Sequence, residues 1–280
     1  MISRGRALGW SLAFLGGGVA LTLPLLVLIA QSPRLASPGG ALWLAALQSL
    51  VLLIVFGVMT WLVGGRILRL GADDFGVRPA GRGFGRFSWA FGIGALLAAL
   101  AMGIAVIAGR ATWHRDGGAL SSWLLSVLAT GAVLLPAALA EELMFRGVPM
   151  IALSRAFGRA PAIVGLSLLF GLVHLSNPGV TGLAVANIAI AGVFLGLAFF
   201  TPGGLWTATG AHLGWNLSLA ALAAPVSGLP LPMPWLDYFA EGPSWLTGGS
   251  FGPEGGVIGA LCLLAGAGFL ARRTTKEATV

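Results

Sequence analysis

Two adjacent carboxylates and an arginine stand in the apolar stretch AEELMFRGVPM, residues 140–150. An α-helix turns by about 100° per residue, so Arg146 shares a face with Glu142, four positions earlier, whereas Glu141 points elsewhere. We therefore expect Glu142 to pair with Arg146. Glu141 is then free to face a cavity as a base or a metal ligand. The alternative is a structural salt bridge at a helix end, without chemistry.

Two histidines follow in similarly apolar surroundings. In FGLVHLSNPG, Phe170 lies four residues before His174, so the ring can pack beside the imidazole and restrict its orientation. In GAHLGWNLS, His212 and Asn216 have the same spacing and present an imidazole and an amide to one space. A lone histidine on an apolar helix is more often a satisfied core residue, so each pattern alone is weak evidence for a site.

The expected depth of these side chains in the membrane predicts that they form one site. Ionisable groups in the hydrocarbon region cost several kcal/mol and are kept where they face the bundle interior or a wet cavity. With a rise of about 1.5 Å per residue from the expected cytoplasmic helix ends, Glu141 and His174 lie roughly 20 Å deep and His212 roughly 12 Å deep. These depths overlap within the uncertainty of the helix ends. Three helices are therefore expected to bring Glu141, His174 and His212 to one level.

The elements that must position these residues are membrane helices. Hydrophobic residues make up 57% of the 280-residue chain and charged residues 9%. Runs of about 20 apolar residues are long enough to cross a bilayer. The fourth run is too long for a simple crossing, and we expect it to be tilted or broken near Gly147 and Pro149. The eight predicted spans are 8–30, 41–63, 87–109, 119–153, 161–176, 182–200, 204–224 and 256–271.

The charge distribution orients these spans. The chain has 16 Lys and Arg residues against 9 Asp and Glu, a net charge of +7, and nearly all of its basic residues fall between the apolar runs. Twelve of them sort to one side of the predicted membrane and three to the other, which places both termini in the cytoplasm. We expect a multi-pass protein of a bacterial-type plasma membrane. No basic cluster is interleaved with aromatic residues, so a nucleic-acid partner is not expected.

Three regions follow from this division. Residues 1–86 are predicted to form a transmembrane helix pair and a solvated, basic cytoplasmic linker, residues 87–271 the transmembrane core, and residues 272–280 a cytoplasmic tail. The outer segment 225–256 is rich in Pro and Gly, has no Lys or Arg, and is interpreted as a lid, an interfacial element or a plain surface loop. The only cysteine, Cys262, excludes an intrachain disulfide.

The ordered motifs resemble those of the CAAX protease and bacteriocin-processing family of intramembrane proteases, which includes the type II CAAX prenyl endopeptidases. They read Glu141-Glu142-x-x-x-Arg146, Phe170-x-x-x-His174 and His212-x-x-x-Asn216. The resemblance covers roughly residues 120–225, and the first spans look like a variable flank. It implies an all-α, polytopic membrane helix bundle.

The resemblance also implies an activity, hydrolysis of a peptide bond in a membrane-embedded or lipidated protein or peptide. Glu141 would activate water and His174 would help to position it, with Glu142 as a further member of the catalytic set. His212 and Asn216 would bind the oxyanion, and Arg146 and Phe170 would position the others. Glu141, His174 and His212 also form a possible zinc set, which would make the protein a metalloprotease. No His-Glu-x-x-His helix is present, and we favour a mechanism without obligatory zinc.

Two rival functions remain open at this stage. A non-catalytic membrane scaffold or immunity protein can use the same fold, and the intact Glu141, His174 and His212 argue against it without excluding it. A transporter would also use a polar cluster at the middle of the membrane and glycine-broken helices, but it often has an internal repeat, and none is visible in this sequence.

Overall fold

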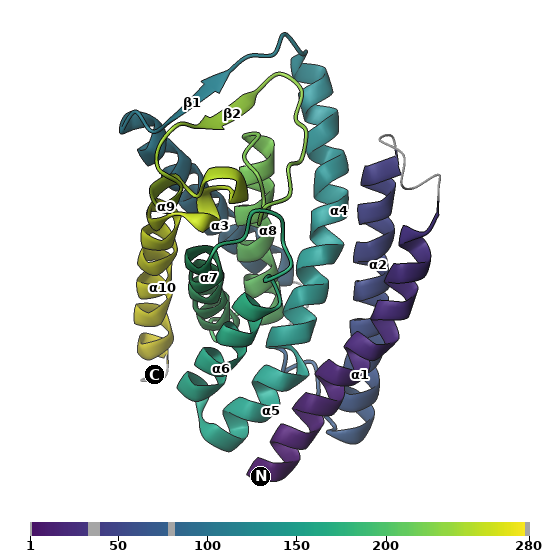
Figure 1. The fold of residues 1–280 in the computed structure, drawn as a ribbon. Helices are drawn as coiled ribbons and strands as arrows, with labels where there is room; N and C mark the ends of the chain where they lie inside the picture. Colours follow the sequence, from purple (N-terminus) through teal and green to yellow (C-terminus); the bar gives the residue numbers. More distant parts are fainter. Residues whose placement is uncertain (1, 33–39, 78–81, 278–280) are drawn as a thin grey trace.

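The computed structural model describes residues 2–32, 40–77 and 82–277, which form a helical bundle with one small sheet (Figure 1). Residues 278–280 of the predicted tail and 78–81 of the predicted linker lie outside this part. The long elements are α1 Arg4–Ala30, α2 Ala41–Met59, α3 Gly83–Ile107, α4 Leu120–Arg146, α5 Val148–Phe157, α6 Arg159–Leu172, α7 Gly182–Phe199, α8 Leu205–Ala221 and α10 Val257–Glu277.

The length and composition of these helices agree with a multi-pass membrane protein. In the described ranges, five helical stretches are long and apolar enough to span a bilayer: Arg4–Ala30, Ala41–Ile67, Gly83–Ile107, Leu120–Phe157 and Gly182–Phe199. Helices α6 and α8 have 14 and 17 residues, short for a perpendicular crossing. The count of eight spans and the cytoplasmic location of both termini therefore stay predictions.

The break predicted near Gly147 and Pro149 is confirmed. Helix α4 ends at Arg146 and α5 begins at Val148, with Gly147 between them at φ −76° and ψ −125°. Pro149 lies in the first turn of α5, where its missing N–H removes no helical hydrogen bond. A Cβ on Gly147 would lie 2.2 Å from the carbonyl oxygen of Leu143, so the glycine is required for the bend. The break leaves both glutamates near the C-terminal end of α4.

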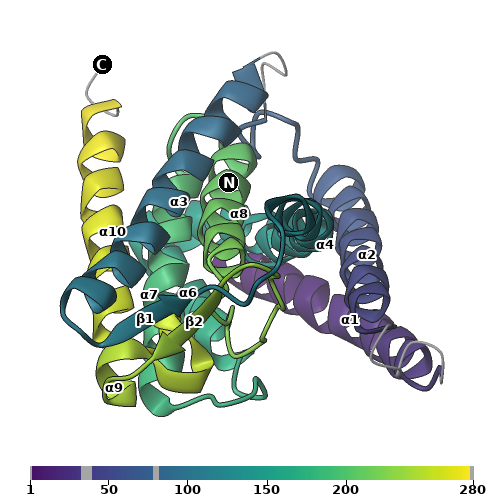
Figure 2. The same ribbon diagram turned by 90° about the horizontal axis from the view of Figure 1, so that it is seen from above.

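The N-terminal pair α1 and α2 packs on one side of the bundle, against α4 and α5 (Figure 2). The rings of Phe14 and Phe56 lie 5.6 Å apart between the two helices. Gly18 makes this possible, because a Cβ there would come within 2.5 Å of the Phe56 ring. Helix α2 continues into the π-helical stretch η2 Thr60–Ile67.

The predicted cytoplasmic linker is only partly solvated. Arg66 and Arg69 are exposed, but Phe75 is buried. The carbonyl oxygen of Phe75 accepts a hydrogen bond of 3.0 Å from the amide of Leu205, at the start of α8. Gly204 permits this approach with φ +50°, since a Cβ there would lie 2.1 Å from the same oxygen. Phe75 is therefore an exception within the segment predicted to be a solvated linker, because its aromatic ring packs in an apolar site.

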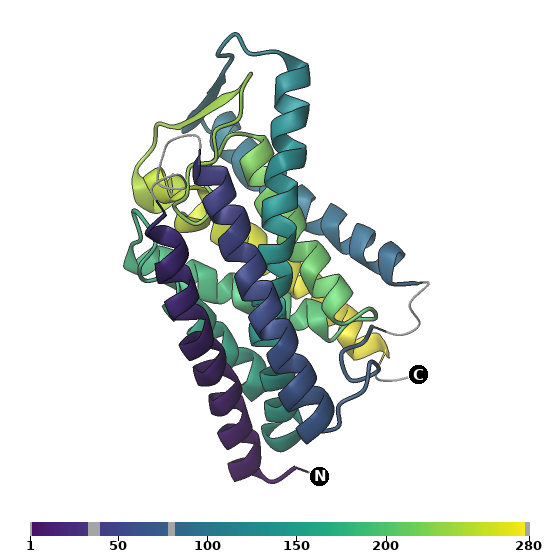
Figure 3. The same ribbon diagram turned by 90° about the vertical axis from the view of Figure 1, so that its right-hand side faces the viewer.

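The outer segment folds against the bundle. Strand β1 Ala111–His114 pairs antiparallel with β2 Asp237–Ala240, and the chain continues through the short helical turns α9 Ser244–Thr247, η4 Gly249–Phe251 and η5 Pro253–Gly255. Figure 3 shows this layer at the top of the bundle, at the opposite end from the chain's N-terminus. Phe251 and Glu254 are almost completely buried. These residues are packed as part of the core.

Close contact between α3 and α8 fixes the helix that carries His212. A Cβ on Gly94 of α3 would lie 2.1 Å from the carbonyl oxygen of Ala211, and a Cβ on Gly214 would lie 2.1 Å from that of Phe91. Small residues let the two backbones touch, which is the usual way in which membrane helices pack tightly.

This contact predicts a difference between two glycines of α3. Gly94→Ala should lower the thermal midpoint in detergent, because the two backbones must separate to make room for the Cβ. The expected loss in the free energy of unfolding is about 1–3 kcal/mol. Gly92→Ala is the matched control, since nothing lies within 4 Å of its Cβ position. Equal midpoints for the two variants would contradict the packing of α3 on α8.

Candidate active site

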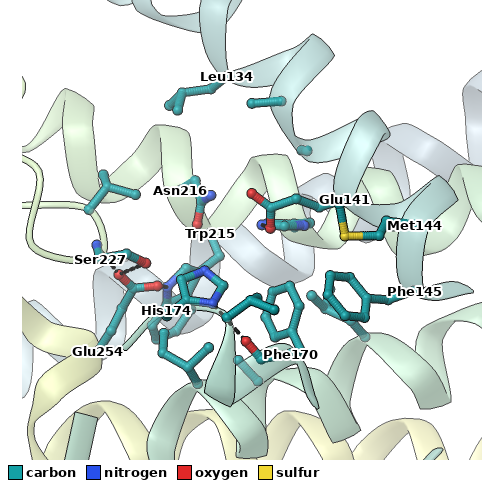
Figure 4. A pocket seen from close by; sticks show the side chains of 18 of the residues that line it. Leu134, Glu141, Met144, Phe145, Phe170, His174, Trp215, Asn216, Ser227 and Glu254 are labelled. Atoms are coloured by element: carbon teal, nitrogen blue, oxygen red, sulfur yellow. Dashed lines mark hydrogen bonds and ion pairs between the residues drawn. The ribbon is translucent and has the colours of Figure 1, made fainter. Parts of the chain in front are cut away.

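A cavity of about 420 Å³ opens inside the bundle between α4, α6, α8 and the outer segment. Its walls are largely apolar. Glu141, His174, His212 and Asn216 bring the polar groups predicted from the sequence to this one space, together with Glu254. Figure 4 shows Glu141, His174 and Asn216 from separate elements around the same opening. The two N-terminal helices also contribute to the wall, through Val19 and Leu52.

The two glutamates of α4 have different surroundings. The side chain of Glu141 is 32% exposed and lines the cavity, whereas that of Glu142 is fully buried and does not line it. Oε1 of Glu142 accepts a hydrogen bond of 3.1 Å from Nη1 of Arg146, which is the predicted ion pair. The position of Glu142 suits a residue that orients other side chains.

The guanidinium of Arg146 is held on several sides. Nη2 donates to the carbonyl oxygen of Gly192 on α7 at 3.0 Å, and the group stacks over the Phe170 ring at 4.6 Å from its centroid. Arg146 is 1% exposed. A buried cation is stable only when paired and hydrogen-bonded in this way.

His174 follows the end of α6 and has a defined ring orientation. Its Nδ1 lies 2.7 Å from the carbonyl oxygen of Phe170. A carbonyl oxygen only accepts, so Nδ1 carries the proton, and in the neutral ring Nε2 keeps its lone pair. The Phe170 ring packs edge-on at 4.9 Å, as the four-residue spacing predicts. Nε2 is thus the nitrogen available to accept a proton.

His212 is placed between the two glutamates. Its Nδ1 is 2.8 Å from Oε1 of Glu142, and its Nε2 is 3.8 Å from Oε2 of Glu141. One turn along α8, Asn216 lines the same cavity. The shared face predicted for His212 and Asn216 is therefore present.

Glu254 is a cavity residue that the sequence reasoning missed. It is 3% exposed and belongs to η5 in the outer segment. Burial raises the pKa of its carboxyl group, and hydrogen bonds from Ser227 and Trp215 oppose this rise. A single acid in the loop sequence FGPEGG gave no signal, because only the docking of the loop places Glu254 at the cavity.

The three residues of the possible zinc set, Glu141, His174 and His212, all face the cavity. Within the described part of the chain, no group of three or more His, Cys, Asp or Glu side chains is arranged to hold a metal ion. We therefore derive no step of the chemistry through a metal.

Fold and site together define a class: a polytopic helical membrane protein with carboxylate and imidazole groups around an internal cavity. The family model "Type II CAAX prenyl endopeptidase Rce1-like" matches residues 121–218, which include all three motifs. The match covers 98 of the 280 residues and agrees with the resemblance of the three motifs to the CAAX protease and bacteriocin-processing family. No curated protein matches the chain, and no solved structure does.

The burial of the Glu142–Arg146 pair predicts a large loss of stability when one partner is removed. Arg146→Met should destabilise the folded protein by about 3–5 kcal/mol, because it leaves Glu142 buried without its cation. The exposed Asp74–Arg155 pair is the control, and Arg155→Met should cost about 1 kcal/mol or less. Thermal unfolding of both variants in detergent tests this; similar midpoints would show that the buried pair is dispensable.

Proposed function

We propose that this chain is an intramembrane endopeptidase that hydrolyses a peptide bond of a membrane-associated or lipidated protein or peptide. The observation that carries the proposal is the convergence of Glu141, His174, His212 and Asn216 on one largely apolar cavity. The family match supports the same class of reaction. A largely apolar cavity with a few converging polar groups is the usual form of an active or ligand-binding site.

Water activation is assigned to Glu141 and His174. A water molecule between the Glu141 carboxylate and Nε2 of His174 would give its proton to Glu141 while its oxygen attacks the carbonyl carbon. His174 is fixed for this task by the hydrogen bond of its other nitrogen to the Phe170 carbonyl. The attack forms a tetrahedral intermediate with a negative oxygen.

Stabilisation of that oxyanion is assigned to His212 and Asn216. Donation from Nε2 of His212 requires a proton on that nitrogen, and Nδ1–H already points to Glu142. We therefore propose that His212 acts as the imidazolium, with a carboxylate near each nitrogen. Asn216 adds an amide N–H. Oriented donors of this kind are often the largest contribution to catalysis of acyl transfer.

The reaction is completed by cleavage of the carbon–nitrogen bond. The intermediate collapses, the carbon–nitrogen pair of electrons leaves with the nitrogen, and the proton held by Glu141 passes to it. The products are a carboxylic acid and an amine, with one water consumed. Glu142 and Arg146 remain outside the cavity and hold His212 in place.

Glu141→Gln is the direct test of the assignment. We expect kcat to fall by about 10²–10⁴ because the amide cannot accept the proton of water, with the folded fraction unchanged. Glu241→Gln, in the outer segment, is the matched control, since Glu241 does not line the cavity.

Comparative proteomics of cells with the wild-type and Glu141→Gln chains identifies membrane peptides to use as substrates. Farnesylated and unmodified forms of one such peptide then test whether the substrate must carry a lipid.

The same variant separates catalysis from a scaffold role. If Glu141→Gln retains full biological activity and no peptide differs between the two proteomes, the protein acts by binding a partner. Neither a scaffold nor a transporter is favoured by a specific contact of the cavity.

The proposed mechanism also predicts insensitivity to chelators. Cleavage by purified protein should continue in the presence of EDTA and 1,10-phenanthroline, because the carboxylate and imidazoles supply the base and the oxyanion donors. Metal analysis of the same preparation is the companion measurement. Stoichiometric zinc whose removal abolishes cleavage, and whose return restores it, would overturn the metal-independent mechanism.

A further inference from the structure

Glu254 is a buried acid that the proposed chemistry does not use. It lies outside the segment that matches the family, at residues 121–218. Both of its carboxyl oxygens are engaged: Oε1 accepts from Nε1 of Trp215 at 3.1 Å, and Oε2 accepts from Oγ of Ser227 at 2.9 Å and from the Ser227 amide. Burying a carboxylate is unfavourable, and an apolar residue would anchor a loop at lower cost. A carboxylate at this buried position therefore points to a role in the site.

One side of this network leads to helix α8. Trp215 directly precedes Asn216 and lies three residues after His212, and its indole N–H ends on Glu254. The indole is buried against the cavity wall. Glu254 therefore fixes the part of α8 from which the proposed oxyanion donors project.

The other side leads to the turn that carries His174. The carbonyl oxygen of Ser227 accepts a hydrogen bond of 2.9 Å from Nδ2 of Asn177. The backbone N–H of Asn177 in turn donates to the carbonyl oxygen of His174 at 3.0 Å. Figure 4 shows Glu254 and Ser227 joined next to His174, with Trp215 and Asn216 beyond. Glu254 thus connects to both halves of the proposed machinery, through Trp215 on one side and through Ser227 and Asn177 on the other.

The backbone of Glu254 is itself held in place. Nδ2 of Asn187 on α7 donates to the carbonyl oxygens of Glu254 at 2.9 Å and of Gly256 at 3.0 Å. The carboxylate is therefore presented from a fixed point. A carboxylate has only acceptor oxygens, so it can accept from the Trp215 indole, the Ser227 amide and the Ser227 hydroxyl at once. A glutamine at this position would place an NH₂ group, itself a donor, against one of these donors.

We propose that Glu254 is a positioning residue of the active site. It holds the turn bearing His174 and the helix bearing His212 and Asn216 at a set separation, so that water attack and oxyanion binding act on the same carbonyl group. This inference rests on the proposed function. It makes the outer segment part of the site, and it predicts that a change in this loop affects the rate of the chemical step more than the binding of substrate.

The test compares Glu254→Gln with Glu241→Gln in the full chain. In Glu254→Gln one hydrogen-bonding arm is lost, and we expect kcat to fall at least tenfold while KM stays within twofold and the thermal midpoint shows a folded protein. Asn177→Ala cuts the link to the His174 turn from its other end, so it should lower kcat similarly, and the double variant should show much less than the product of the two losses. Glu241→Gln should behave as wild type.

Hydrogen–deuterium exchange of residues 173–180 provides a readout without substrate. Exchange should rise in Glu254→Gln and Asn177→Ala, and not in Glu241→Gln or Glu141→Gln. The positioning role would be overturned by unchanged exchange, by an unchanged kcat, or by strictly multiplicative losses in the double variant. If Glu254→Gln fails to fold, the same measurements on Asn177→Ala decide the question. If exchange rises as expected in the two variants but the wild-type chain cleaves no peptide, the proposed protease function is rejected instead.

Discussion

The arrangement of the site depends on a carboxylate buried among apolar helices. Glu142 has no exposure to solvent and contacts both Arg146 and His212. An isolated charge at this depth would be strongly unfavourable, so the three side chains must stay together. Arg146 reaches α7 through Gly192, and His212 belongs to α8. The cluster therefore ties α4, α7 and α8 to each other and fixes the edge of the cavity.

Backbone features make this cluster possible. The bend at Gly147 ends α4 directly after Arg146, which leaves a cation at the C-terminal end of the helix, where the helix dipole favours it. The glycines of α3 and α8 bring Ala211, and hence His212, to within backbone contact of α3. A Cβ added at this contact would push α8 away from α3 and would move the His212 imidazole relative to Glu142 and Glu141. Tight packing is thus part of the chemistry of the site.

The cavity has two kinds of wall, and each has a separate origin. The segment that matches the family model provides the motif residues, on α4, on α6 and the turn after it, and on α8. Apolar side chains from α1 and α2, together with Ser227 and Glu254 of the outer segment, complete the enclosure from parts of the chain outside that match. Most residues that line the cavity belong to the matching segment, and the first two helices and the outer segment close the remaining sides.

Local spacing was sufficient for part of the site. The Glu142–Arg146 pair, the packing of Phe170 on His174, the shared face of His212 and Asn216 and the break near Gly147 all follow from helical periodicity or from proline and glycine stereochemistry, which act within a few residues. Apolar run length likewise predicted a helical membrane protein, with α10 extending six residues beyond its predicted end at residue 271.

Contacts between distant segments were decided only by the tertiary structure. The sequence contains no periodic signal that joins His212 to Glu142, Glu254 to Trp215 and Ser227, or Phe75 to the start of α8. The pairing of β1 with β2 joins residues more than a hundred positions apart. Such contacts depend on which helices pack together and at what distance. Sequence by itself therefore determined the residues and their helical faces, and the packing of the helices determined which of those faces share a cavity.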